Sequence, residues 1–212
     1  MQVLSVICDV ILLGCAGTAL AMISPTAKPY AFTGCAIMAT YGAISLYANA
    51  LDKAEDTQKI QEVVGNIMVL VPLPLVNIEL YLVSETSNIG LGHCLYIVPY
   101  ILEVCFEISQ YMHTPPDPNA EPAADAAPEK EQDNALVLKT LTQLGSIWSL
   151  VYIGVNDSKN LYLGMAGMAF FYIFVPHFVE HYFEGHGENC HLLGASGFCL
   201  LTIKAVEGQA AA

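Results

Sequence analysis

The fold is decided by the stretch VLSVICDVILLGCAGTALAMI, residues 3–23, in which Asp9 is the only charged residue. A transmembrane helix needs about 20 consecutive apolar residues to cross a bilayer, and this stretch has that length. No positive charge precedes it, whereas a cleaved signal peptide begins with a cationic segment. We therefore expect residues 3–23 to form a retained membrane-spanning helix.

Six further apolar windows extend the same pattern along the chain. Pro72 and Pro74 fall inside one of them and predict a bend there. Lys139 and several hydroxyl and amide side chains make another window the most polar of the long ones, and the last window is short for a span. The sequence therefore predicts an all-α, polytopic transmembrane bundle with six or seven spans. The six windows cover residues 30–51, 60–83, 89–112, 135–155, 161–182 and 191–203.

The composition agrees with a chain embedded in a lipid bilayer. Hydrophobic residues make up 55% of the sequence and charged residues 13%, whereas about a quarter of the residues of a soluble protein are charged. The few charges are mostly acidic, with a formal net charge of −13 and no arginine. Binding to nucleic acid is excluded, because it needs clustered lysine and arginine for the phosphates.

One polar segment interrupts the apolar pattern. Residues 113–134 read HTPPDPNAEPAADAAPEKEQDN and contain no aliphatic side chain larger than alanine. Such a segment cannot bury a core, so we expect a long, acidic, disordered loop. The loop divides the chain into a four-helix membrane half at residues 1–112 and a two- or three-helix half at residues 135–205, followed by a short tail at residues 206–212.

Small residues predict where helices approach one another closely. In lipid, glycine, alanine, serine and threonine allow close backbone contact between helices. The simpler interpretation is general packing inside the bundle, and the alternative is a homo- or hetero-oligomer formed through these faces. The stripes comprise Gly14, Gly17, Thr18 and Ala21 in the first window, Gly164 and Gly167 in the sixth, and Gly194 and Gly197 in the seventh.

Three of the carboxylates inside apolar windows, Asp9, Glu103 and Glu107, are the strongest functional feature. Ionisable side chains within a membrane are costly and usually face the bundle interior or a wet cavity. Glu103 and Glu107 are four residues apart and so share one helix face, and Lys139 enters from the same side of the membrane. These four residues are candidates for a proton or small-cation pathway.

Histidines and acids also gather at the end of the sixth window, in PHFVEHYFEGHGENCH at residues 176–191. His177 and His181 are four residues apart, with Glu180 and Glu184 beside them, and this ligand set suits a divalent metal ion such as zinc. The alternative is an interfacial, amphipathic helix end. No HExxH pattern supports the metal site, so the interfacial interpretation is favoured.

Two functional classes remain open from the sequence. One is a small-cation or proton transporter, or a channel-like protein, that uses the intramembrane carboxylates. The other is a non-catalytic scaffold or accessory subunit of a larger membrane complex. A membrane metalloenzyme is the third and least favoured, because no nucleophile or third ligand motif is visible, and we therefore do not expect an enzyme. The feature that discriminates between transport and scaffolding is whether a buried carboxylate faces a wet cavity.

Overall fold

The computed structural model describes residues 2–50, 55–84, 92 and 129–210, and within these ranges it is helical with no strand. Glu103 and Glu107, and residues 113–128 of the predicted loop, lie outside the described residues. The described helices are α1 (Gln2–Met22), α2 (Pro29–Ala50), α3 (Glu55–Leu70), α4 (Pro72–Val83), α6 (Glu129–Asn156), α7 (Asn160–Tyr182) and α8 (Gly187–Ala210).

Five segments of the described chain are long and apolar enough to cross a membrane. They agree with the predicted all-α, multi-pass membrane protein. Helix α6 corresponds to the predicted window that carries Lys139, and its polar first half explains why it is not among the five. The five segments are Val3–Met22, Pro29–Ala50, Thr57–Val83, Asn160–Tyr182 and Gly187–Gly208.

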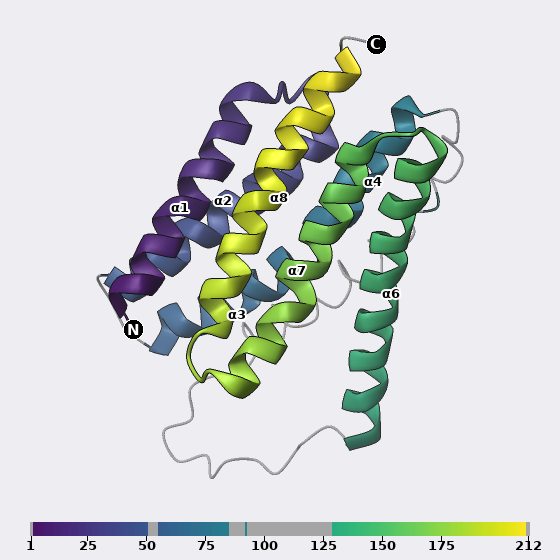
Figure 1. Cartoon of the computed structure of the whole chain (residues 1–212). Helices are drawn as coiled ribbons and strands as arrows, with labels where there is room; N and C mark the ends of the chain where they lie inside the picture. The colour runs from purple at the N-terminus through teal and green to yellow at the C-terminus, as the bar shows by residue number, and fades with distance from the viewer. Residues whose placement is uncertain (1, 51–54, 85–91, 93–128, 211–212) are drawn as a thin grey trace.

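The helices form a closed ring rather than a row. Each of α1, α2, α4, α6, α7 and α8 packs against the next, and α8 packs back against α1. Figure 1 shows α8 between α1 and α7, with α2, α3 and α4 behind them. The start of α1, the start of α6 and the α7–α8 turn lie at one end of the bundle, called the N-terminal end here, and α8 finishes at the opposite end.

Helix α1 shows how the sequence produces this packing. Its buried face carries Cys8, Leu12, Ala16 and Ala19, which recur at helical spacing, whereas large apolar residues such as Val3 on its other face are exposed, as suits contact with lipid. The predicted stripe at Gly14, Gly17, Thr18 and Ala21 is exposed. General packing through that stripe was therefore the wrong prediction for α1, because Ala16 and Ala19 provide the close contact instead.

The later stripe at Gly194 and Gly197 does pack inside the bundle. A Cβ atom added at Gly194 would lie 2.7 Å from the Cβ of Tyr172, and one at Gly197 would overlap Met168. Both contacts join α8 to α7, so these glycines let the two backbones approach closely.

The third predicted window is divided where its prolines lie. Helix α3 ends at Leu70 and α4 begins at Pro72. Proline has no backbone N–H and cannot continue the helical ladder, which is why the break falls at Val71. The predicted bend is confirmed.

Two predicted boundaries were wrong. Helix α6 begins at Glu129, inside the stretch predicted as loop, because its acidic residues suit the positive end of a helix dipole. Helix α8 extends from Gly187 to Ala210, well beyond the apolar window at residues 191–203. Polar residues in its first turns are buried among other helices, so hydropathy alone underestimates its length.

Candidate polar site at the N-terminal end

Asp9 is the innermost member of a polar cluster that joins four helices. It lies on α1 with no solvent exposure, and its Oδ2 accepts a hydrogen bond of 2.8 Å from Nδ2 of Asn49 on α2. Its Oδ1 has no hydrogen-bond partner among the described residues. Burial of a carboxylate with one unsatisfied oxygen lowers the stability of the fold. Stabilisation of the fold alone therefore does not explain Asp9.

Amide and hydroxyl groups continue the cluster outward from Asp9. Asn49 Nδ2 also donates to Ser45 Oγ at 3.2 Å, and Gln61 Nε2 on α3 donates to the same oxygen at 3.2 Å. Gln61 Nε2 also lies 2.9 Å from Oε1 of Glu188 on α8. A continuous set of hydrogen bonds therefore links the buried Asp9 to Glu188.

Glu188 is exposed and forms the outer end of the cluster. Besides Gln61, its Oε1 accepts a hydrogen bond of 3.1 Å from the Tyr41 hydroxyl and a longer one of 3.5 Å from Ser45 Oγ. Several donors converge on one carboxylate oxygen and hold the Glu188 side chain in place. The Asp9 cluster is defined here as Asp9, Tyr41, Ser45, Asn49, Gln61 and Glu188.

His191 lies beside the cluster and offers a hydrogen-bond acceptor, its ring nitrogen Nε2. Its Nδ1 lies 2.7 Å from the carbonyl oxygen of Tyr172, and a carbonyl can only accept, so Nδ1 carries the proton. In the neutral ring, Nε2 is then an acceptor. The ring is 9% exposed, and Nε2 has no hydrogen-bond partner within the described part of the chain.

Two pockets meet at His191. One, of about 400 Å³, is lined by Pro176, His177, Glu180, Gly185, Gly187, Glu188 and His191. The other, of about 330 Å³, is lined by Tyr41, Gln58, Gln61, Glu62, Gly65, Asn66, Val69 and His191. The described linings include three carboxylates and no lysine, so the local field favours a cation.

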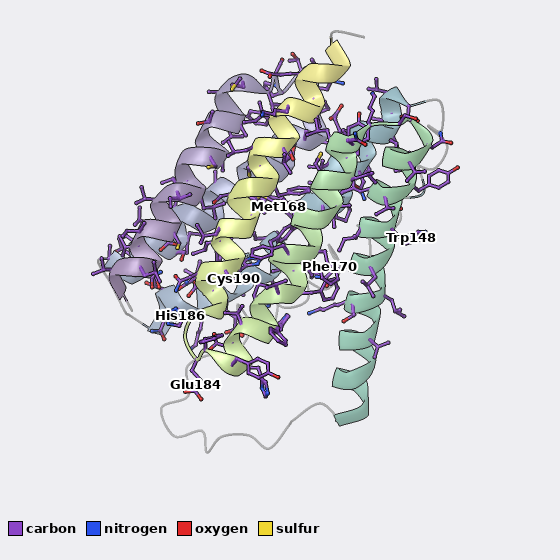
Figure 2. The ribbon with its side chains drawn as sticks, in the orientation of Figure 1. Trp148, Met168, Phe170, Glu184, His186 and Cys190 are labelled. Carbon is purple, nitrogen blue, oxygen red and sulfur yellow. The ribbon has the colours of Figure 1, made fainter. Side chains whose placement is uncertain are left out.

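The α7–α8 turn fixes the shape of the first pocket. Glu180 accepts backbone N–H bonds from Gly185 and Gly187, each at 2.8 Å, through its two carboxylate oxygens. Gly185 has φ 77°, which favours glycine. A Cβ at Gly187 would lie 2.8 Å from both Glu180 Oε2 and Pro176 O. Figure 2 shows the same turn with Glu184 and His186 labelled.

The predicted metal ligands are not brought together as a set. His177, His181 and Glu184 are exposed, and both oxygens of Glu180 are engaged by the turn. In the ranges that the structure describes, no three His, Cys, Asp or Glu side chains are grouped to hold a metal ion.

Lys139 does not lie near Asp9 either. It lies on α6, which packs against α7 and α4, whereas Asp9 lies on α1, which packs against α2 and α8. Of the four predicted pathway residues, the structure therefore describes only these two, and it places them on separate parts of the ring.

Several members of the site were missed from the sequence, although a signal was present. Tyr41, Ser45 and Asn49 recur every four residues in an apolar helix and so share one face. Gln61, Glu188 and His191 had no comparable pattern, since their role depends on which helices are neighbours.

A second buried carboxylate, Glu79, lies on α4. It is 3% exposed, and its Oε2 accepts hydrogen bonds from the backbone N–H groups of Tyr30 at 3.0 Å and Ala31 at 3.4 Å. Its Oε1 lies 4.0 Å from Lys28 Nζ. Glu79 therefore caps the start of α2, where the helix dipole favours a negative charge.

An apolar groove lies between α6 and α7. It has a volume of about 780 Å³, and its lining includes Trp148, Phe170, Gly145 and Gly167. Trp148 is 72% exposed, and Figure 2 labels it on α6 and Phe170 on α7. A Cβ added at either glycine would meet nothing within 4 Å, so the groove is open at both.

Residues 25–206 match the family described as Domain of unknown function (DUF4791). The match covers most of the chain, so the protein belongs to this family. Comparisons with curated proteins and with solved structures give no match.

Proposed function

We propose that this family member carries protons or small cations across a membrane, with Asp9 as the buried binding group and Glu188 at the entrance. The observation that supports this most is the chain of hydrogen bonds from Glu188 to the wholly buried Asp9, whose Oδ1 has no partner among the described residues. Intramembrane carboxylates of this kind are typical of ion and proton pathways.

A carrier fits the described helices better than an open pore does. Beyond Asp9, the buried face of α1 continues with Leu12, Ala16 and Ala19, which are apolar and fully buried. An ion bound at Asp9 therefore meets a dry core, and its passage requires a change in helix packing. Such alternating access is how carriers work.

The test is flux in liposomes that contain the purified full-length chain and a trapped pH-sensitive dye. We expect wild-type protein to dissipate an imposed pH gradient, or a potassium or sodium gradient in matched vesicles. Asp9→Asn keeps the size of the side chain and removes its charge, so flux should fall to the level of protein-free liposomes.

The matched control is Glu207→Gln, which changes an exposed carboxylate on α8. Its flux should equal that of the wild type. Absence of flux in wild-type vesicles that contain folded protein, or equal flux in Asp9→Asn, would refute the proposal.

A second candidate is an accessory subunit that docks a helix of a membrane partner in the α6–α7 groove. The open space at Gly145 and Gly167 beside Trp148 favours this alternative, because small residues allow close helix contact in lipid. Gly167→Leu should fill the groove and release a co-purifying partner without changing flux, and retention of the partner would contradict it.

A further inference from the structure

Three sulfur atoms meet in the core, away from the Asp9 cluster. Cys35 and Met38 are three residues apart on α2 and face Cys199 on α8. Cys199 Sγ lies 3.1 Å from Met38 Sδ, and Cys35 is close enough to Cys199 for the two thiols to interact. All three residues are buried, and the described cysteines are free thiols.

The arrangement is close to that of a three-coordinate metal site. A d¹⁰ ion bonded to thiolate sulfur at about 2.3 Å keeps three sulfur ligands roughly 4 Å apart in a trigonal plane. Here the Sγ of Cys199 and the Sδ of Met38 are 3.1 Å apart, which is closer than that. A small outward shift of α2 from α8 would bring this pair to the spacing that the ion needs.

The chemistry of the ligands selects the ion. Two thiols and a thioether are soft ligands, which prefer copper(I) to hard cations such as magnesium or calcium. The set contains no histidine or carboxylate, which zinc sites with mixed ligands commonly include. We propose that Cys35, Met38 and Cys199 form a copper(I) site between α2 and α8, here called the sulfur site.

Binding of copper(I) at the sulfur site is balanced in charge. When copper(I) binds, one thiol loses its proton, and the resulting thiolate neutralises the ion. The second thiol and the thioether remain neutral donors, and one proton is released for each ion bound. The buried complex then carries no net charge, which limits the cost of placing an ion in a dry core.

A further cysteine lies towards the outside of the sulfur site. Cys15 on α1 is partly exposed and interacts electrostatically with Cys199. It is a fourth soft side chain next to the sulfur site. The sulfur site is independent of the proton and cation pathway proposed above.

The test uses the purified full-length protein in detergent, fully reduced and without oxygen. Copper(I) is supplied as its coloured complex with bathocuproine disulfonate, and transfer to the protein is followed by loss of that colour. We expect one copper(I) per chain to be removed from the chelator. Met38→Leu conserves volume, and it should lower the affinity by about tenfold or more through loss of one ligand.

Cys199→Ser should abolish transfer, whereas Cys190→Ser, which changes a cysteine outside the sulfur site, should bind like the wild type. X-ray absorption of the loaded protein should show about three sulfur neighbours around copper. No transfer to reduced wild-type protein, unchanged affinity in Met38→Leu, or loss of binding in Cys190→Ser rather than Cys199→Ser would each overturn the proposal. None of these results depends on flux.

Discussion

Two carboxylates are buried in the described part of this bundle, and they have opposite surroundings. Glu79 lies at the start of α2, where two backbone N–H groups and Lys28 meet its two oxygens. Asp9 lies near the N-terminal end of the bundle, where Asn49 occupies one oxygen and the other has no partner among the described residues. Both are almost inaccessible to solvent.

Burial is common to the two carboxylates, so only their hydrogen-bond partners distinguish them. A buried charge that is fully partnered stabilises the fold by satisfying other groups, here the start of a helix. A buried charge that is half-partnered leaves capacity to bind something else. The variants below test this contrast, beginning with the largest expected effect on stability.

Removal of Glu79 should be the most damaging change. Glu79→Ala leaves the N–H groups of Tyr30 and Ala31 without their acceptor and removes the carboxylate beside Lys28. We expect a loss of about 2–4 kcal/mol in the free energy of unfolding, measured as a lower midpoint of thermal unfolding in detergent. Glu79→Gln retains an acceptor oxygen and should lose less. Equal stability of Glu79→Ala and wild type would contradict the structural role.

The turn that shapes the first pocket should be the next most sensitive. In Gly187→Ala, the added methyl group would lie against Glu180 Oε2 and Pro176 O. We expect a cost of about 1–3 kcal/mol, as is usual for overpacking. The control is Gly14→Ala, where an added Cβ meets nothing within 4 Å. That variant should be as stable as the wild type or slightly more so, because alanine favours helix.

Neutralisation of Asp9 should change stability less than Glu79→Ala does. The change should also be in the opposite direction. Asp9→Asn retains an oxygen that can accept from Asn49 and removes a charge whose burial is costly. We expect thermal stability to change by no more than about 1 kcal/mol, and to rise rather than fall. A loss of stability as large as that of Glu79→Ala would show that Asp9, like Glu79, mainly stabilises the fold, and would contradict the difference drawn between the two.

Loss of the Tyr41 hydroxyl should have an effect of similar size to that of Asp9→Asn, but it should lower stability. Tyr41→Phe removes one of the donors to Glu188 Oε1 while Gln61 still donates to it. We expect a loss of about 0.5–1.5 kcal/mol. Gln61→Leu provides the complementary measurement, and the double variant should lose more than the sum of the two single losses, since it leaves Glu188 without both donors. Strict additivity would show that the two donors act independently.

Most of the helices could be predicted from the sequence, because hydropathy windows follow from the thickness of a bilayer. Membership of the Asp9 cluster could be predicted only for Asp9, since a charged residue in an apolar stretch is conspicuous. Gln61 and His191 could not be recognised, because their role depends on which helices are neighbours. His177 and His181 drew attention by their spacing, yet both are exposed, whereas His191 at the start of α8 lines both pockets.

Helix α1 begins at one end of the bundle, and α8 finishes at the opposite end (Figure 1). In a bilayer, we expect these two ends to face different compartments, which predicts an odd number of crossings between them. A fluorescent or protease-sensitive tag ahead of α1 and another behind α8 should therefore report opposite compartments in the same cell. The two tags together would also show which compartment Glu188 faces.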